Sequence, residues 1–184
     1  MRNVRWGLAL IFLLGACGGS ATRASAPSAP AGDGHAVLEV VGSGPSASSR
    51  MVCGPEGKEE IAASVGVDTS RPLAGKWSVH LYSCDYVYRG NFVMTLSVKE
   101  LSNASETTAY FDMLGVKLGR MRPLQGLGQG AFQTRNGSTV VRKDFRVLLV
   151  DPTRLPEMFG RPSSPRRDVA LSVAATILGC WTGA

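Results

Sequence analysis

The chain has 184 residues and a formal net charge of +6, from 20 basic and 14 acidic side chains. Once a leader and a linker are set aside, the remaining length suits one domain with its own core and is too short for two. The basic residues do not form the dense Lys/Arg runs of a nucleic-acid binder, so the sequence predicts no nucleic-acid partner.

The first sixteen residues predict a bacterial lipoprotein signal peptide. Arg2 and Arg5 form a positive start, residues 6–14 are apolar, and Leu14, Gly15, Ala16 and Cys17 form a lipobox-like site. A short transmembrane anchor is the alternative, but nine residues of helix cover only about half of the ~30 Å hydrocarbon core. We therefore expect removal of residues 1–16 and acylation of Cys17 with diacylglyceryl and palmitate chains. The mature domain, with a charge of 18 − 14 = +4, would be lipid-anchored at the extracytoplasmic face of a bacterial cell membrane.

Residues 17–50 are predicted to form a flexible linker. They are rich in Ala, Ser, Gly and Pro and poor in large apolar side chains, so ordering them would cost more entropy than burial returns. Residues 36–41 interrupt this composition with a strand-like run, which is a candidate edge strand. The domain itself is expected to cover residues 51–184.

The first half of that domain reads as a helix followed by a hairpin. Pro55 begins a helix through Val65, and Gly66 ends it. Residues 77–88 are predicted to form a strand dense in aromatic side chains, and a turn follows. Residues 92–99 then alternate apolar and polar side chains, which is the period of a half-buried strand.

A second helix is indicated by a capping box. Asn103 stands three residues before Glu106, and apolar positions recur at helical spacing through Leu118. Residues 123–130, with three glycines and a proline, predict a passage of turns.

Three strands and a helix complete the predicted order. Asn136 and Gly137 predict a hairpin between residues 131–134 and 138–142, and residues 145–150 predict another strand. A C-terminal helix is expected from Ser164 as the cap and Pro165 at its first position. The order α-β-β-α-β-β-β-α predicts an α+β domain with a mainly antiparallel sheet of about five strands.

The cysteines are disulfide candidates because an exported thiol meets an oxidising environment. Besides Cys17 there are three, so they cannot all pair with one another. A bond between Cys53 and Cys84 would link the first helix to the first strand, and Cys180 would then be a buried thiol on the last helix. Pairing of Cys84 with Cys180, or an intermolecular bond through Cys180, are the alternatives.

The order of these features resembles small actinobacterial lipoproteins of unknown function. The features are Cys53 ahead of a helix, the aromatic strand around Cys84, and a Gly-Leu-Gly passage leading into Ala131 and Phe132. This layout is in turn similar to the extracellular sensor domains of some actinobacterial serine/threonine kinases. The resemblance covers residues 51–184 and implies an α+β fold, a Cys53–Cys84 disulfide and a binding role. It carries over no catalytic residues.

The sequence gives little support for catalysis. There are only two histidines, and His35 lies in the predicted linker while His80 lies on a strand. Neither a histidine-based metal site nor a nucleophile triad can be assembled from them, and no spacing pairs two carboxylates. We therefore expect a protein that is not an enzyme and that uses no metal or cofactor.

Two clusters are candidate ligand contacts. Aromatic side chains on both faces of the first strand predict that some of Tyr82, Tyr86 and Tyr88 line an apolar or glycan-binding groove. Arginines crowd the start of the last helix, where positive charge opposes the helix dipole. Asp168 is the simplest partner for them. The alternative is a contact with phosphate or an acidic partner, made by Arg161, Arg166 and Arg167.

The sequence thus favours a non-catalytic envelope lipoprotein that binds a small apolar or glycan ligand or an envelope protein partner. The alternative is a structural or accessory envelope subunit without a ligand of its own. An envelope hydrolase is the least favoured, because the sequence offers no nucleophile or metal set.

Overall fold

A computed structural model of the chain describes residues 42–71 and 73–181. Contacts divide the chain into two units, residues 1–33 and 34–184, and every described residue belongs to the second. The predicted signal peptide, the acylation site Cys17 and the strand-like residues 36–41 lie outside the described residues.

The domain is built on one antiparallel sheet of seven strands, in the order β1-β2-β3-β7-β6-β5-β4. Most neighbours in the sheet are also neighbours in sequence, and the exception is the pairing of β3 with β7. A separate two-stranded ribbon, β8 with β9, precedes the last helix. The strands are Lys76–Ser78 (β1), Leu81–Val87 (β2), Val93–Glu100 (β3), Arg120–Leu124 (β4), Gly130–Thr134 (β5), Thr139–Lys143 (β6), Arg146–Arg154 (β7), Met158–Phe159 (β8) and Ser164–Pro165 (β9).

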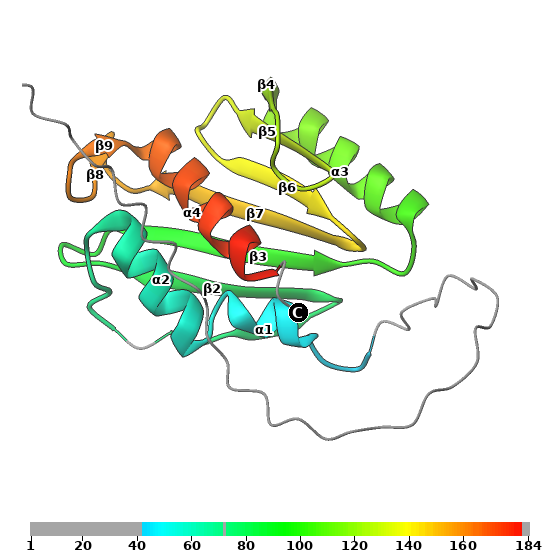
Figure 1. The fold of residues 1–184 in the computed structure, drawn as a ribbon, viewed down its shortest axis with the longest axis horizontal. Coiled ribbons are helices and arrows are strands. Elements are labelled where there is room, and N and C mark those ends of the chain that lie inside the picture. The colour runs from blue at the N-terminus through cyan, green and yellow to red at the C-terminus, as the bar shows by residue number, and fades with distance from the viewer. Residues whose placement is uncertain (1–41, 72, 182–184) are drawn as a thin grey trace, which may run out of the picture. The chain divides into compact units, whose positions relative to one another are not determined.

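Three helices cover one face of the sheet: α1 (Ala47–Met51), α2 (Pro55–Val65) and α4 (Arg166–Trp181) (Figure 1). Because successive strand residues point to opposite faces, Leu96 and Val98 of β3 and Leu148 of β7 all face these helices. They join buried residues of α2 and α4 in the larger of two apolar clusters.

The fourth helix, α3 (Ala104–Leu118), packs on the other face. Phe111 and Leu114 of α3 contact Phe132, Val140 and Val147 of β5, β6 and β7 in a second buried cluster. In Figure 1 this helix lies beside β5 and β6, at the end of the sheet away from β2. Among the described elements, helices therefore cover both faces of the sheet at β5, β6 and β7, whereas β1, β2 and β3 are covered on one face.

The expected helix signals operate as predicted. Gly66 ends α2 in the left-handed region with φ 70°, where a residue without Cβ is unstrained. The Asn103 side chain accepts a 2.9 Å hydrogen bond from the Glu106 N–H, and the Glu106 carboxylate reaches back to the N–H of Ser102 at 3.2 Å.

The α+β class and the antiparallel sheet are confirmed, but the sheet has seven strands and not about five. The predicted strand 77–88 divides into β1 and β2, because Val79 and His80 adopt positive φ angles of 49° and 55° and turn the chain. Residues 120–124, which precede and begin the predicted passage of turns, form the edge strand β4.

Two predicted boundaries need correction. The predicted linker extends to Arg50, but residues 47–50 belong to α1, where Ser49 is fully buried. Glu100 at the end of β3 holds this segment: it accepts hydrogen bonds from the Ser46 N–H at 2.8 Å and from the Ser49 hydroxyl. The last helix begins at Arg166, because the predicted cap residues 164–165 pair with β8.

The disulfide joins Cys53 to Cys84, with a Cα–Cα distance of 5.9 Å. It links the short segment between α1 and α2 to the middle of β2, and the resemblance implied this pairing. Beside it, the Tyr86 hydroxyl donates a 2.7 Å hydrogen bond to the carbonyl of Val52. Cys180 lies outside this bond, and its side chain is half-buried near the end of α4 instead of fully buried.

In the described part of the chain, no helix has both the length and the apolar character needed to cross a membrane.

Candidate functional site

The tyrosines predicted to line a groove lie beneath the helices. Tyr82 and Tyr86 pair with Val98 and Met94 of β3, so they point to the face covered by α1, α2 and α4. Tyr82 is half-buried there, Tyr86 is fully buried, and Tyr88 just beyond β2 is 1% exposed. Burial raises the pKa of both Tyr86 and Tyr88.

The prediction of aromatics on both faces is wrong because it treated residues 77–88 as one strand. Trp77 belongs to β1 and pairs with Tyr82, which puts both on the same face of the sheet. Tyr86 and Tyr88 are therefore core residues, and they offer no surface to a ligand in this structure.

The predicted arginine cluster is divided. Arg166 and Arg167 line a pocket of about 430 Å³ at the start of α4, together with Arg135 from the β5–β6 hairpin. Arg161 is exposed and does not line this pocket; its backbone packs against Gly66 at the end of α2. Only the tertiary contact between the hairpin and α4 brings Arg135 to the other two.

A second candidate surface is the face of β1, β2 and β3 opposite the three helices. Helix α3 packs on this same face, but its apolar contacts are with β5, β6 and β7. No helix of the described chain therefore covers the first three strands on this side. The side chains that point to this open face come from alternate positions: Lys76, Ser78, Leu81, Ser83, Asp85, Val87, Val93, Thr95, Ser97 and Lys99.

Asp85 is the centre of a hydrogen-bonded group on the open face. Its carboxylate accepts a 2.7 Å hydrogen bond from the Thr95 hydroxyl and a 2.8 Å charged hydrogen bond from Arg154 at the end of β7. Arg154 also bonds the Thr95 hydroxyl at 2.8 Å. Partial burial raises the pKa of Asp85, but these hydrogen bonds and the charges of Arg154 and Lys76 outweigh it and lower the pKa.

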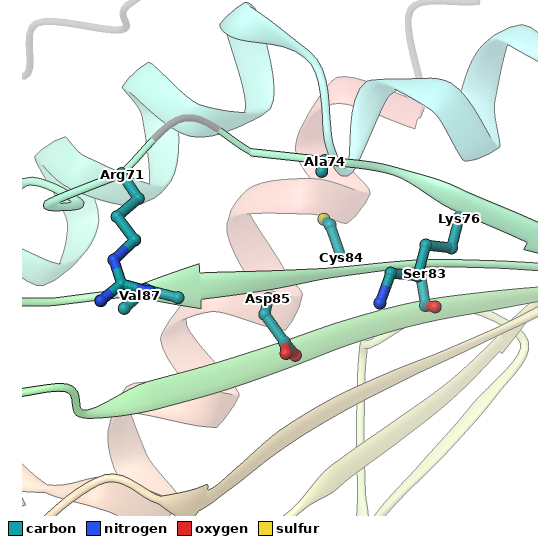
Figure 2. A pocket seen from close by; sticks show the side chains of 7 residues that line it. All are labelled: Arg71, Ala74, Lys76, Ser83, Cys84, Asp85 and Val87. Atoms are coloured by element: carbon teal, nitrogen blue, oxygen red, sulfur yellow. The ribbon is translucent and has the colours of Figure 1, made fainter.

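Beside this group the surface is hollowed into a pocket of about 300 Å³ (Figure 2). Figure 2 shows Asp85, Ser83 and Val87 on β2, with Arg71 and Lys76 approaching from the segment before β2. The pocket thus has two cationic side chains and one carboxylate, and its floor is the edge of the sheet.

Asp85 and His80 were the side chains to examine for acid–base chemistry. Hydrogen bonds from Thr95 and Arg154 and the charge of Arg154 lower the pKa of Asp85, whereas a general acid needs a raised pKa. His80 is exposed on the turn after β1 and makes an edge contact with Trp77 at 5.8 Å between ring centroids. Within residues 42–71 and 73–181, no three His, Cys, Asp or Glu side chains form a group that could hold a metal ion.

The polar row on β3 was visible in the sequence, since Thr95, Ser97 and Lys99 alternate with buried positions. Its continuation on β2 has the same signal, because Ser83 and Asp85 alternate with Tyr82, Cys84 and Tyr86. The sequence does not show that the two rows lie side by side, since that depends on the register between β2 and β3. Neither Arg154 nor Arg135 could be placed, because each meets its site through strand pairing and loop packing across the fold.

No known protein family, no curated protein and no solved structure matches this chain. The resemblance to actinobacterial lipoproteins therefore stays a prediction from the order of residues in the sequence.

Proposed function

We propose that this protein is a non-catalytic, lipid-anchored extracytoplasmic domain that binds an envelope protein partner through the open face of β1, β2 and β3. The observation that carries the proposal is the contrast between the two halves of the sheet. Helices cover both faces of β5, β6 and β7, whereas the first three strands have a polar face that no described helix covers.

A protein partner fits this face better than an apolar or glycan ligand. A small-molecule site is a concave, mostly apolar pocket, and aromatic side chains are its usual walls. Here Tyr86 and Tyr88 are buried in the core, and Ser83, Thr95 and Ser97 form a broad polar surface. The strands β1, β2 and β3 have three, seven and eight residues. With about 3.3 Å per residue and about 4.8 Å between strands they give a surface of roughly 300 Å², so flanking loops must also contribute to a stable contact.

The charge of the face indicates an acidic partner. Arg71, Lys76, Lys99 and Arg154 provide four positive charges. The acidic side chains beside them are Asp85, which pairs with Arg154, and Asp151 of β7, which lies opposite Thr95, so the face has a net charge of 4 − 2 = +2. Complementary charge speeds association and selects the partner.

The disulfide and the predicted acylation site support a location at the extracytoplasmic face of the membrane. Cys53–Cys84 is expected in an oxidising compartment, and a chain tethered at Cys17 would meet its partner at the membrane surface. The alternative, an accessory subunit without a ligand, predicts that the open face is a solvated surface only.

The first test is native mass spectrometry of the acylated protein gently extracted from its own host, compared with the same sample denatured. A second mass that is present natively and lost on denaturation would reveal a bound partner. The variant Ser97→Glu places a negative charge on the open face, and Ser105→Glu places the same charge on the exposed first turn of α3.

We expect the bound mass to disappear in Ser97→Glu and to persist in Ser105→Glu. A bare mass for the unmodified protein, or equal retention of the partner by both variants, would refute binding through this face and leave the accessory role.

A further inference from the structure

The pocket at the start of α4 is a second site, separate from the open face of the sheet. It is lined by the tip of the β5–β6 hairpin, the β8–β9 ribbon and the first residues of α4, and has a volume of about 430 Å³. Its charged side chains are Arg135, Arg166, Arg167 and Glu157, which sum to 3 − 1 = +2.

The three arginines have different surroundings. Arg166 is anchored: it pairs with Glu157 at 3.2 Å and donates hydrogen bonds to the carbonyls of Thr153 and Leu155. Among the described residues, the guanidinium group of Arg167 has one acidic neighbour, Asp168, at 3.8 Å.

Arg135 differs from both. Its backbone N–H bonds the carbonyl of Gly119, and among the described residues no carboxylate or carbonyl engages its guanidinium group. Arg135 and Arg167 thus keep most of their donors available to a ligand, because an arginine has five N–H donors and no acceptor.

Tight packing between the hairpin and the helix holds these groups in place. Gly137 has a φ of 89°, and a Cβ added there would lie 3.3 Å from the Cβ of Arg167. The side-chain oxygen of Asn136 is occupied by the Thr134 hydroxyl at 2.5 Å and the Ser138 N–H at 3.2 Å. The amide group of Asn136 can therefore offer only N–H donors to the pocket.

We propose that this pocket binds the phosphate group of a small organic phosphomonoester. A phosphomonoester carries a charge of about −1.5 to −2 at neutral pH, which matches the +2 of the pocket. Guanidinium groups bind phosphate through paired N–H donors. Bringing three guanidinium groups to one pocket is unfavourable by itself, and a bound dianion removes that repulsion.

The pocket is larger than a phosphate group alone requires. Met158, which is 53% exposed, and Pro165 supply an apolar wall beside the arginines. This wall suits the organic part of a ligand of sugar-phosphate size. Arg161, which the sequence grouped with Arg166 and Arg167, does not line the pocket and has no part in this proposal.

The proposal is tested by isothermal titration calorimetry on the full-length acylated protein in a neutral detergent. The soluble probe is glucose 6-phosphate, with glucose as the uncharged comparison. Dibutyryl phosphatidic acid, with the matching short-chain phosphatidylcholine, is the lipid headgroup probe, because it is water-soluble and does not depend on the acyl anchor for binding.

The informative variants are Arg135→Gln and Arg167→Gln, because both side chains are exposed and neither anchors the fold. Each should weaken binding of a phosphate probe about tenfold or more, since each removes a charged hydrogen bond. Arg161→Gln is the matched control and should leave the affinity unchanged. Arg135→Lys should recover part of the affinity, because it restores the charge without the paired donors.

Binding of glucose 6-phosphate would assign a soluble phosphomonoester, and binding of the phosphatidic acid alone would assign a lipid headgroup. Failure of both probes up to about 10 mM would overturn the proposal. An equal loss of affinity in Arg161→Gln would also overturn it, because it would show that only the overall positive charge matters. Equal thermal midpoints for all variants would establish that any loss of binding is not a loss of folding.

Discussion

Removing the disulfide by the double substitution Cys53→Ala and Cys84→Ala should lower the free energy of unfolding by about 4 kcal/mol. The bond closes a loop with a sequence separation of 31 residues. In the chain-entropy model such a loop reduces the entropy of the unfolded chain by about 12 cal/mol/K, or about 3.7 kcal/mol at 25 °C. Loss of the buried Cys84 sulfur, whose residue is 4% exposed, adds a small cavity cost.

The measurement is urea denaturation followed by tryptophan fluorescence, which reports on Trp77 near the edge of the sheet and Trp181 at the end of α4. The dependence of the free energy on urea should become steeper, because the unfolded chain without the bond exposes more surface. Cys180→Ala is the control and should change the free energy by less than about 1 kcal/mol, since this half-buried residue lies outside the disulfide. A loss below about 1 kcal/mol in the double variant, with an unchanged urea dependence, would refute the loop-entropy reasoning.

Three further substitutions test the contacts that hold the elements together. Burial raises the pKa of Glu100, but hydrogen bonds from Ser46 and Ser49 and the charge of Arg146 lower that pKa overall. The Glu100 carboxylate therefore stabilises the fold above its ordinary pKa of 4.5, and this stabilisation is lost as the pH falls through the lowered pKa of the folded state. Glu100→Gln should therefore reduce stability at neutral pH by about 1–2 kcal/mol and flatten the acid part of a curve of urea midpoint against pH, and an unchanged curve would contradict this. Tyr86→Phe should cost about 1–3 kcal/mol in the same urea assay, because it leaves the buried carbonyl of Val52, at the C-terminal end of α1, without its 2.7 Å hydrogen bond; a neutral result would mean that another donor replaces the hydroxyl. Asn103→Ala should lower the thermal midpoint through a loss of about 1 kcal/mol of helix capping, whereas Asn103→Ser should restore most of it, and equal midpoints for the two variants would show that the cap contributes nothing.

The sequence predicted those elements whose signals are local. The capping box at Asn103, the glycine stop at Gly66 and the Asn136–Gly137 turn each act within a few residues, and the structure has a helix or a hairpin at each of them. The alternation along β3 also predicted that Met94, Leu96 and Val98 are buried, because the period of two is a property of the strand itself. It was wrong at the start of the strand, where Phe92 is exposed and Val93 is buried.

Prediction failed where neighbouring elements decide the conformation. Residues 77–88 have the composition of one long strand, and only the positive φ angles at Val79 and His80 reveal the turn between β1 and β2. Residues 120–123 are exposed and include a proline, so the strand β4 depends on pairing with β5. Helix α1 has five residues, which is too short to be stable by itself, and it depends on Glu100 for its attachment.

In the candidate sites, too, local sequence signals predicted some features and tertiary contacts decided the others. The amino-acid sequence alone determined the α+β class, the helix caps, the polar row of β3 and the crowding of arginines near the last helix, because these follow from residue type and spacing. The tertiary structure decided that Tyr86 and Tyr88 belong to the core, that Asp85 meets Arg154, and that Arg135 replaces Arg161 beside Arg166 and Arg167. Strand pairing and the packing of hairpin against helix bring residues together that lie tens of positions apart, and no local pattern in the chain records those contacts.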